Sequence, residues 1–417
     1  MASGAGDAAG PSLFDGLRRD YQALFGDSWS PYLGAVLLVA VLTALMASGQ
    51  FWGIFGGLKL WGDWLNNAIG LGPLLGLKAD LESPVMHRMS LMNGTLVAGA
   101  FAAALLGRQF AMHRAPKLEY VWGALGGVLM GVGASLAGGC TTGGFFTPIV
   151  HGSPAGWAMA AGLILGALVG LKLLLWTLEH VQWGMAAPPT GDDPGLRDWH
   201  PLAGWLVLAG AVLWAMSWAA SGDAKLVSRA ILILAGLSIG FVMQRSRLCF
   251  ARAMREPFMT AEGEMTKAII LALALAMPVA ALLFEKKVLD PYLAIPPTFW
   301  IGSLAGGILF GVGMVFAGGC ASGALWRMGE GHLKLWVATF AFAWSGSTFS
   351  ALAKGWNLLA VEQNIDTMLD ETRVGTQVFL PQVLDGWLPA LLLSYGILVA
   401  WYLLVRYNES TEKFTVL

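Results

Sequence analysis

The sequence predicts an all-α polytopic membrane protein composed of two related halves. Of its 417 residues, 56% are apolar and only 12% are charged, and apolar runs long enough to cross a bilayer recur along the chain. The alternating segments of a membrane β-barrel are absent, and Leu and Ala dominate instead. An internal repeat, described below, indicates that the helical architecture occurs twice.

Ten apolar segments are the expected crossing or membrane-depth helices, at residues 31–50, 92–107, 120–138, 155–178, 201–220, 227–243, 266–284, 298–318, 335–353 and 387–406. We expect residues 31–180 to form the first transmembrane half and residues 201–406 the second, joined by a Pro-, Gly- and Asp-rich linker at 181–200. The acidic stretch 354–386 is expected to form an extramembrane loop, and 407–417 a C-terminal tail.

Residues 1–30 form an N-terminal lead-in without the pattern of a secretory signal, so we expect it to be retained. Apolar side chains between Leu13 and Phe25 recur at helical spacing, which favours an interfacial amphipathic helix; a flexible lead-in is the alternative. Basic residues cluster at 108–117 and 245–255. The positive-inside rule places both clusters on the cytoplasmic side.

The internal repeat relates GGVLMGVGASLAGGCTTG (126–143) to GGILFGVGMVFAGGCASG (306–323). The two segments align without a gap at an offset of 180 residues, with eleven identities in eighteen positions. Glycines four residues apart in each copy predict helices that approach a neighbour closely. Membrane proteins built from two such halves, often as an inverted repeat, usually place their substrate site where the halves meet near the midplane.

Each copy of the repeat ends in a predicted helix break beside a cysteine. Gly138 and Gly139 precede Cys140, and Gly318 and Gly319 precede Cys320. A break at membrane depth is tolerated only where the freed backbone faces protein or a water-filled path. The unpaired N–H groups that begin the next helical segment, with its dipole, suit an anion. The hydroxyls of Thr141, Thr142 and Ser322 add further donors.

A thiol offers a weak S–H donor on a soft, polarizable atom, which matches a sulfur- or selenium-bearing anion. A single buried cysteine is more often a space-filling residue, but two at equivalent repeat positions favour a shared site. The third cysteine, Cys249, lies in GFVMQRSRLCFARAMRE (240–256), among Arg245, Arg247, Arg252 and Arg255. An arginine at a helix centre costs about 3 kcal/mol, so this cluster indicates an interface, a cavity or a bound anion.

The segment after Cys320 carries Arg327, Glu330 and His332, whereas the first copy has FFTPIVHGS there. The two halves are therefore not functionally equivalent. Arg327 and Glu330 are spaced to pair with each other along a helix. Glu330 and His332 are also candidates for proton handling.

Together these motifs make the chain recognisable. GFVMQRSRLCF, AGGCASGALWRMGEGH and the second AGGCTTGG resemble the YeeE/YedE sulfur-transport family of bacterial inner-membrane proteins over roughly residues 31–406. With the lone GGC half first and the RSRLC half second, the layout is most similar to the selenium-associated YedE branch.

The resemblance implies a multi-pass inner-membrane transporter that imports thiosulfate, passed between Cys249, Cys140 and Cys320 by S–H hydrogen bonds. It also implies an hourglass of long helices around half-length helices that meet near the centre, and a soluble TusA-like partner that accepts sulfur. The reversed order of the halves makes a selenium oxyanion or another reduced-sulfur anion the second candidate substrate.

Other functions fit the sequence less well. Net charge near zero argues against a nucleic-acid partner, leaving membrane lipid and a small anion, and the absence of any Gly-Lys dipeptide excludes a P-loop. We predict no enzyme activity and no cofactor. The main alternative is a membrane-embedded sulfurtransferase or redox enzyme that uses a persulfidated cysteine. A three-thiolate soft-metal site ranks below it, because the glycine-rich flanks favour an anion and no His or Cys lies close by in sequence. We therefore expect no metal site.

Overall fold

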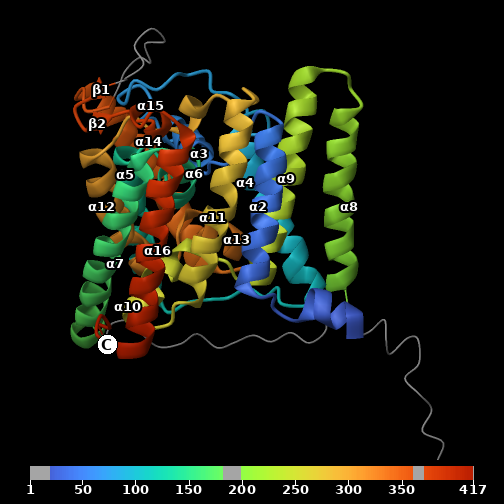
Figure 1. The fold of residues 1–417 in the computed structure, drawn as a ribbon. Coiled ribbons are helices and arrows are strands. Elements are labelled where there is room, and N and C mark those ends of the chain that lie inside the picture. The colour runs from blue at the N-terminus through green and yellow to red at the C-terminus, as the bar shows by residue number, and fades with distance from the viewer. Residues whose placement is uncertain (1–18, 182–198, 360–370, 417) are drawn as a thin grey trace, which may run out of the picture.

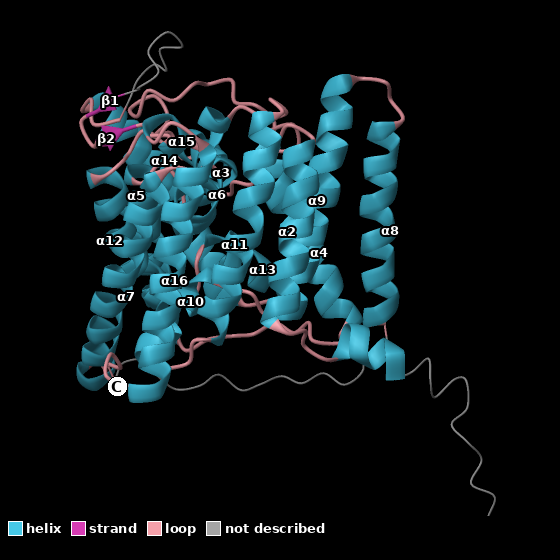
Figure 2. Ribbon diagram, in the orientation of Figure 1, coloured by secondary structure: helices cyan, strands magenta, loops and turns pink. Residues whose placement is uncertain are grey.

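The protein is a bundle of roughly parallel helices, seen from the side in Figure 1. The computed structural model describes residues 19–181, 199–359 and 371–416. Within these residues, eight helices are long and apolar enough to cross a membrane, or up to nine if a bent pair counts as one span. Figure 2 shows how little strand accompanies them. The prediction of an all-α polytopic membrane protein is confirmed.

The first half contributes helices α2 to α7, two of them short. Their bounds are α2 Pro31–Ala47, α3 Phe55–Ala68, α4 Arg88–Leu106, α5 Lys117–Leu136, the π-helical turn η2 Thr141–Phe146, α6 Thr147–Val150 and α7 Pro154–His180. Before α2, a helical segment over Arg19–Gly26 bends by 74° from it. The residues before Arg19 and most of the expected linker lie outside the described residues, so both expectations stay predictions.

The second half contributes helices α8 to α16. Their bounds are α8 His200–Ala219, α9 Ala224–Ser246, α10 Phe250–Met259, α11 Glu264–Glu285, the 3-10 turn η4 Pro291–Ala294, α12 Ile301–Ala317, α13 Ala321–Glu330, α14 Leu333–Gly355, α15 Leu380–Val383 and α16 Trp387–Thr411. Between α14 and α15, strands β1 Glu371–Thr372 and β2 Gly375–Thr376 form an antiparallel hairpin. In Figure 1 this hairpin lies at the upper end of the bundle.

Glycines bring α5 and α12 into direct backbone contact. A methyl group at Gly126 would lie 2.5 Å from the Gly313 carbonyl oxygen, and one at Gly133 would lie 2.5 Å from that of Gly306. In the internal repeat, Gly126 matches Gly306 and Gly133 matches Gly313. The two contacts are therefore equivalent: replacing each glycine by its repeat partner turns one contact into the other. The two helices therefore cross antiparallel about a local two-fold relation. An inverted repeat requires such a crossing; the inversion itself stays a prediction.

Each repeat helix also packs against a long helix of the other half. Gly131 of α5 lies against Phe342, Ser345 and Gly346 of α14, where an added methyl group would approach to between 2.0 and 2.7 Å. The matching contacts of Gly311 in α12 fall on α7, at Leu163, Gly166 and Ala167. The predicted close approach of the repeat helices is thus present, and the partner of each comes from the opposite half.

Four short helices fill the interior between the long ones. In Figure 1, α3 and α6 lie in the upper half of the view, and α10 and α13 lie in the lower half. Three of them complete a broken span: η2 and α6 follow α5, α10 follows α9, and α13 follows α12. The sequence predicted breaks after α5 and α12. It did not predict α3, whose 14 residues are too short and too polar to be recognised as a membrane helix.

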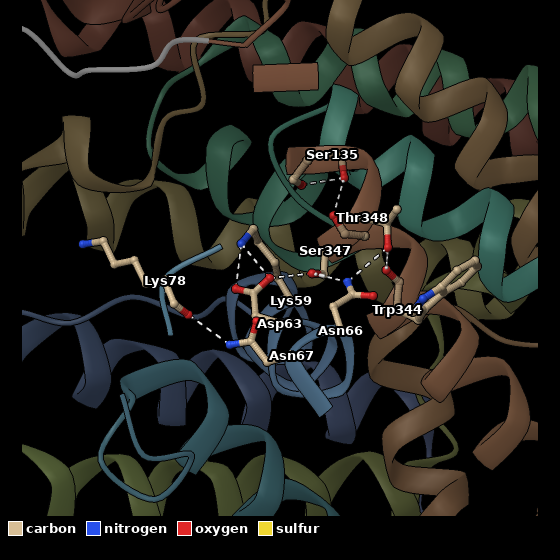
Figure 3. Close-up of polar contacts among 11 residues, drawn as sticks. Lys59, Asp63, Asn66, Asn67, Lys78, Ser135, Trp344, Ser347 and Thr348 are labelled. Atoms are coloured by element: carbon tan, nitrogen blue, oxygen red, sulfur yellow. Dashed lines mark hydrogen bonds and ion pairs between the residues drawn. The ribbon is translucent and has the colours of Figure 1, made fainter. Parts of the chain in front are cut away.

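A buried polar network anchors α3 to α14, as Figure 3 shows. The Lys59 ammonium binds Asp63 at 2.8 Å, and Asp63 accepts a hydrogen bond of 2.5 Å from Ser347. Asn66 donates to Ser347 and to Thr348, at 2.9 and 3.1 Å. Because apolar contact with lipid is no worse than contact between helices, such interhelical hydrogen bonds help to hold a short helix in place.

The α5–α12 crossing gives the first prediction. We expect Gly133→Ala to destabilise the protein by about 1 to 3 kcal/mol, because its methyl group meets rigid backbone on α12 and the helices must separate. The midpoint of thermal unfolding in detergent measures this. Gly210→Ala is the matched control, since nothing lies within 4 Å of a methyl group there on α8. Equal midpoints for the two variants would contradict the close crossing.

Candidate functional site

All three cysteines occupy the same position in the backbone, directly before a short helix. Cys140, Cys249 and Cys320 are the N-cap residues of η2, α10 and α13, each with extended dihedral angles. The residue two positions earlier is left-handed in every case, with φ of 71° at Gly138, 55° at Arg247 and 82° at Gly318. The chain therefore makes one kind of helix break three times, and each break presents a thiol.

The break before Cys249 contains no glycine. A left-handed arginine costs roughly 1 kcal/mol or more relative to glycine, so other contacts must stabilise it. The guanidinium of Arg247 supplies them: it binds Glu330 at 2.5 Å and donates to Gln109 at 3.0 Å. This break depends on contacts with segments far away in the sequence, so no local signal in RSRLC revealed it.

The thiols lie among hydrogen-bonding groups that are fully enclosed. Cys140 Sγ is 3.0 Å from the Thr142 hydroxyl, and Cys320 Sγ accepts from the Gly323 N–H at 3.4 Å. Cys320 Sγ also lies 3.4 Å from the Ser322 hydroxyl. Beside Cys140, the buried Thr141 hydroxyl has no hydrogen-bond partner among the described residues. Donors are thus available at both glycine breaks, as the sequence predicted.

Two of the three thiols face one glycine. A methyl group at Gly323, in the first turn of α13, would lie 2.9 Å from Cys249 Sγ and 3.3 Å from Cys320 Sγ. Both cysteines are free thiols with no exposed surface. Cys140 belongs to the other half of the molecule, where η2 contacts α13. The structure therefore brings Cys249 and Cys320 to the same glycine of α13, and the break at Cys140 lies next to α13.

A cavity of about 290 Å³ adjoins the Cys140 break. We call it the vestibule. Its lining comes from the break itself, from the segment before α3, from Met89 and from the chain before α12; the residues are Phe51, Gly53–Gly56, Met89, Gly138, Gly139, Gly143 and Tyr292–Pro297. None of these side chains is charged. The vestibule is therefore a neutral space, and its lining includes the exposed backbone of Gly138.

Charged groups gather at α13 and at the end of α9. Glu330 binds Arg247 at 2.5 Å, accepts from Gln244 at 2.9 Å and lies 3.4 Å from His332 Nε2. Arg327 instead turns back and donates to the Gly318 carbonyl at 2.9 Å. The alternative that Arg327 and Glu330 pair along the helix is thus wrong, because each finds a partner from another segment.

The buried ring of Trp326 contacts two arginines of this region. The central carbons of the Arg247 and Arg327 guanidinium groups lie 5.6 and 5.1 Å from its centroid. The indole N–H donates to the Leu248 carbonyl, next to Cys249. Sequence reasoning missed Trp326, and also Gln109 and Gln244. An aromatic residue directly before Arg327 was the available signal for Trp326.

Arg245 differs from the other site candidates, because it lies against the N-terminal segment. Its guanidinium donates to the Asp27 carbonyl and, at 3.5 Å, to Gln109. Since Gln109 also binds Arg247, the basic loop 108–117 and the arginine cluster lie on the same face, as the charge pattern predicted. Within the described residues, no three His, Cys, Asp or Glu side chains are grouped to hold a metal ion.

His151, in the loop after α6, is a buried histidine near the vestibule. Its ring packs against Phe284 at 4.8 Å and Phe51 at 6.4 Å, and it hydrogen bonds the Pro291 backbone. Burial lowers the pKa of His151 to about 4, which the hydrogen bond to Pro291 only partly offsets. The folded protein therefore holds this ring neutral at pH values where an exposed histidine is charged.

Comparison with known proteins connects this arrangement to a family. The model of a family described as "Sulphur transport" matches residues 15–169 and 245–416. The chain is 29% identical to the probable transporter YedE of Escherichia coli (strain K12) over 325 residues, 74% of this chain and 77% of that protein. It is also 29% identical to the thiosulfate transporter TsuA of Spirochaeta thermophila over 188 residues, 44% of this chain and 56% of that protein.

The buried histidine gives a prediction about pH. Because its folded pKa is lowered, the contribution of neutral His151 is complete above about pH 6.5 and is lost as pH falls towards 4. The full loss amounts to about 3 kcal/mol. We expect His151→Gln to reduce the fall in thermal unfolding midpoint between pH 7 and pH 4.5. The exposed His180→Gln is the control, and an unchanged pH dependence in His151→Gln would refute the assignment.

Proposed function

Because the chain belongs to the sulphur-transport family, we propose that it imports thiosulfate along a path lined by Cys140, Cys249 and Cys320. A selenium oxyanion or another reduced-sulfur anion is the second candidate substrate. The family and the membrane helices establish a multi-pass protein of the bacterial inner membrane that transports a sulfur compound. The identity of the anion and the role of the thiols are the proposal.

One observation carries this proposal: every cysteine of the chain is the N-cap of a short helix after a left-handed residue. A space-filling cysteine has no reason to recur at such a position. At a helix N-terminus, a thiol is joined by unpaired N–H groups and by the positive end of the helix dipole. Such a site suits an anion with a soft sulfur atom, because the dipole attracts charge and the thiol contacts sulfur.

The order of contacts follows from the surroundings of each thiol. The vestibule reaches Gly138 and Gly139, so an anion that enters it meets the Cys140 break first. The unpaired Thr141 hydroxyl offers a donor there. Cys249 and Cys320 come next at Gly323, and the arginines lie beyond them. The path thus leads from a neutral vestibule to a basic exit, which the charge pattern places on the cytoplasmic side.

The sulfurtransferase alternative uses the same thiols differently. An enzyme would hold sulfur covalently as a persulfide on one cysteine, whereas a transporter leaves the thiols unchanged. The similarity to transporters favours transport. Mass spectrometry of the purified protein after turnover with thiosulfate separates the two, because a persulfide adds one sulfur atom to a cysteine peptide.

Import of a dianion against an inside-negative potential of 100 mV costs about 4.6 kcal/mol. We propose that a soluble TusA-like acceptor on the cytoplasmic side helps by consuming the imported sulfur. Glu330 and His332, 3.4 Å apart, are candidates for an accompanying proton. Equal net uptake into vesicles with and without such an acceptor would count against the role of the acceptor.

The proposal predicts that each thiol matters separately. In proteoliposomes, we expect Cys140→Ser, Cys249→Ser and Cys320→Ser each to lower uptake of labelled thiosulfate by about tenfold or more, because a lost contact to a charged ligand costs about 1.5 kcal/mol or more. Thr177→Ser, at a buried position of α7 away from the thiols, is the control. Parental rates in all three cysteine variants would rule out the path.

A second variant tests the path without removing a thiol. Gly323→Ala leaves every cysteine in place but puts a methyl group 2.9 Å from Cys249 Sγ and 3.3 Å from Cys320 Sγ. We expect uptake to fall at least as far as in the serine variants, because the methyl group fills the space that both sulfur atoms face. Gly94→Ala on α4, where a methyl group meets nothing within 4 Å, is the control. Normal uptake in Gly323→Ala would place the anion elsewhere.

A further inference from the structure

Two arginines beside the thiols have no carboxylate partner. Near α10 and α13, Arg252 binds Glu256 and Arg247 binds Glu330, each at 2.5 Å. Arg255 and Arg327 remain. In the described part of the chain, neither forms an ion pair, and the buried Nε of Arg255 has no hydrogen-bond partner at all.

Both unpaired arginines lie close to Cys249. Arg255 lies on α10, whose N-cap is Cys249, and Arg327 lies on α13, whose N-cap is Cys320. The two helices are in contact, and both thiols face Gly323 of α13. The bond from Arg327 Nη1 to the Gly318 carbonyl holds this guanidinium beside the break that presents Cys320. The Trp326 ring lies against its other side. Arg327 is therefore fixed in position before any ligand arrives.

We propose that Arg255 and Arg327 form a second anion site, directly beyond Cys249 and Cys320, for the SO₃ end of a dianionic thio-oxoanion. This inference rests on the proposed transport of such an anion. Arg255 is selected here from the arginines around Cys249 because Arg247 and Arg252 are paired with carboxylates and Arg255 is not.

The charge of the pair fits a dianion. Two half-buried guanidinium groups carry two positive charges, and neither forms an ion pair with a described carboxylate, so their removal from water is not compensated by a direct partner. Each guanidinium also presents parallel N–H donors that match two oxygens of an oxyanion. Thiosulfate carries three such oxygens on one sulfur and a terminal sulfur on the other side. Its two ends therefore match the two kinds of group found here, guanidinium and thiol.

The arrangement also sets the orientation of the anion. With its oxygens on Arg255 and Arg327, its terminal sulfur points back towards Cys249 and Cys320 at Gly323. Arg247 takes no part, because its guanidinium is already paired with Glu330. The site therefore distinguishes anions by charge at the oxygen end, whereas the thiols distinguish them by the softness of the other end.

Selectivity between two sulfur anions tests this site. Methanethiosulfonate keeps the terminal sulfur of thiosulfate but has one negative charge and one oxygen fewer. In proteoliposomes, we expect Arg255→Gln and Arg327→Gln each to raise the half-saturating concentration of labelled thiosulfate by about tenfold. Competition by methanethiosulfonate should weaken far less, so the preference for the dianion falls. Arg255→Lys and Arg327→Lys should retain part of that preference, because they keep the charge.

The matched control is the double variant Arg252→Gln/Glu256→Gln, which removes a paired arginine from the same helix without changing net charge. It should leave the preference unchanged. Equal loss of both anions in the Arg255 and Arg327 variants, with the dianion preference intact, would overturn the site. Size-exclusion profiles identify any variant that fails to fold, and the lysine variants then decide the question.

The transport proposal and this site fail in different ways. If the parent protein takes up no thiosulfate, the transport proposal fails. The site is then measured by calorimetric titration of the purified protein with thiosulfate and with sulfate. Binding of both dianions that Arg255→Gln and Arg327→Gln weaken supports the site, and absence of such binding in the parent refutes it.

Discussion

The backbone contact between α5 and α12 is the constraint on which the rest of the molecule depends. Gly133 lies against Gly306 and Gly126 against Gly313, so closely that no side chain fits between the two backbones at either point. Each helix ends a few residues later in a break, at Gly138 and at Gly318. The crossing therefore fixes where both breaks occur, and each thiol follows its break by two residues. Because α5 also packs on α14 and α12 on α7, neither half is complete without the other, and the site between them forms only when both fold together.

A structural feature could be predicted from the sequence where neighbouring residues cause it, and not where distant residues do. Adjacent glycines have a local effect on the backbone, so the breaks before Cys140 and Cys320 were predictable, as was the helical membrane fold. The left-handed Arg247 was not, because its conformation is stabilised by Glu330 and Gln109, which lie far away in the sequence. The short helix α3 escaped prediction for a related reason. Its polar residues Asp63 and Asn66 suggest a loop until Ser347 and Thr348 of α14 are placed opposite them.

The distribution of charge explains why Arg247 and Arg327 differ in role. Arg327 and Glu330 have the spacing of an ion pair along a helix, yet α13 begins at Cys320 with a carbonyl nearby that needs a donor. Arg327 satisfies the Gly318 carbonyl, and Glu330, at the far end of α13, meets Arg247, Gln244 and His332 from other segments. The carboxylates within α10 and α13 are thus both occupied, Glu256 by Arg252 and Glu330 by Arg247. The arginines that remain without a carboxylate partner, Arg255 and Arg327, lie on the two helices that begin at Cys249 and Cys320.

The two halves surround the proposed path with different groups. Along each half, α3 in the first corresponds in order to α10 in the second, but the segment before α3 carries Gly53 and Ile54 where α10 is preceded by Cys249. That segment lines the vestibule, which holds no charged side chain among its described lining, while arginines surround Cys249. The proposed path therefore leads from a neutral space, past single contacts with sulfur, towards increasing positive charge. Two equivalent halves would present the same groups at both ends of such a path, whereas here one half lacks a thiol before its short helix and the other carries the arginines.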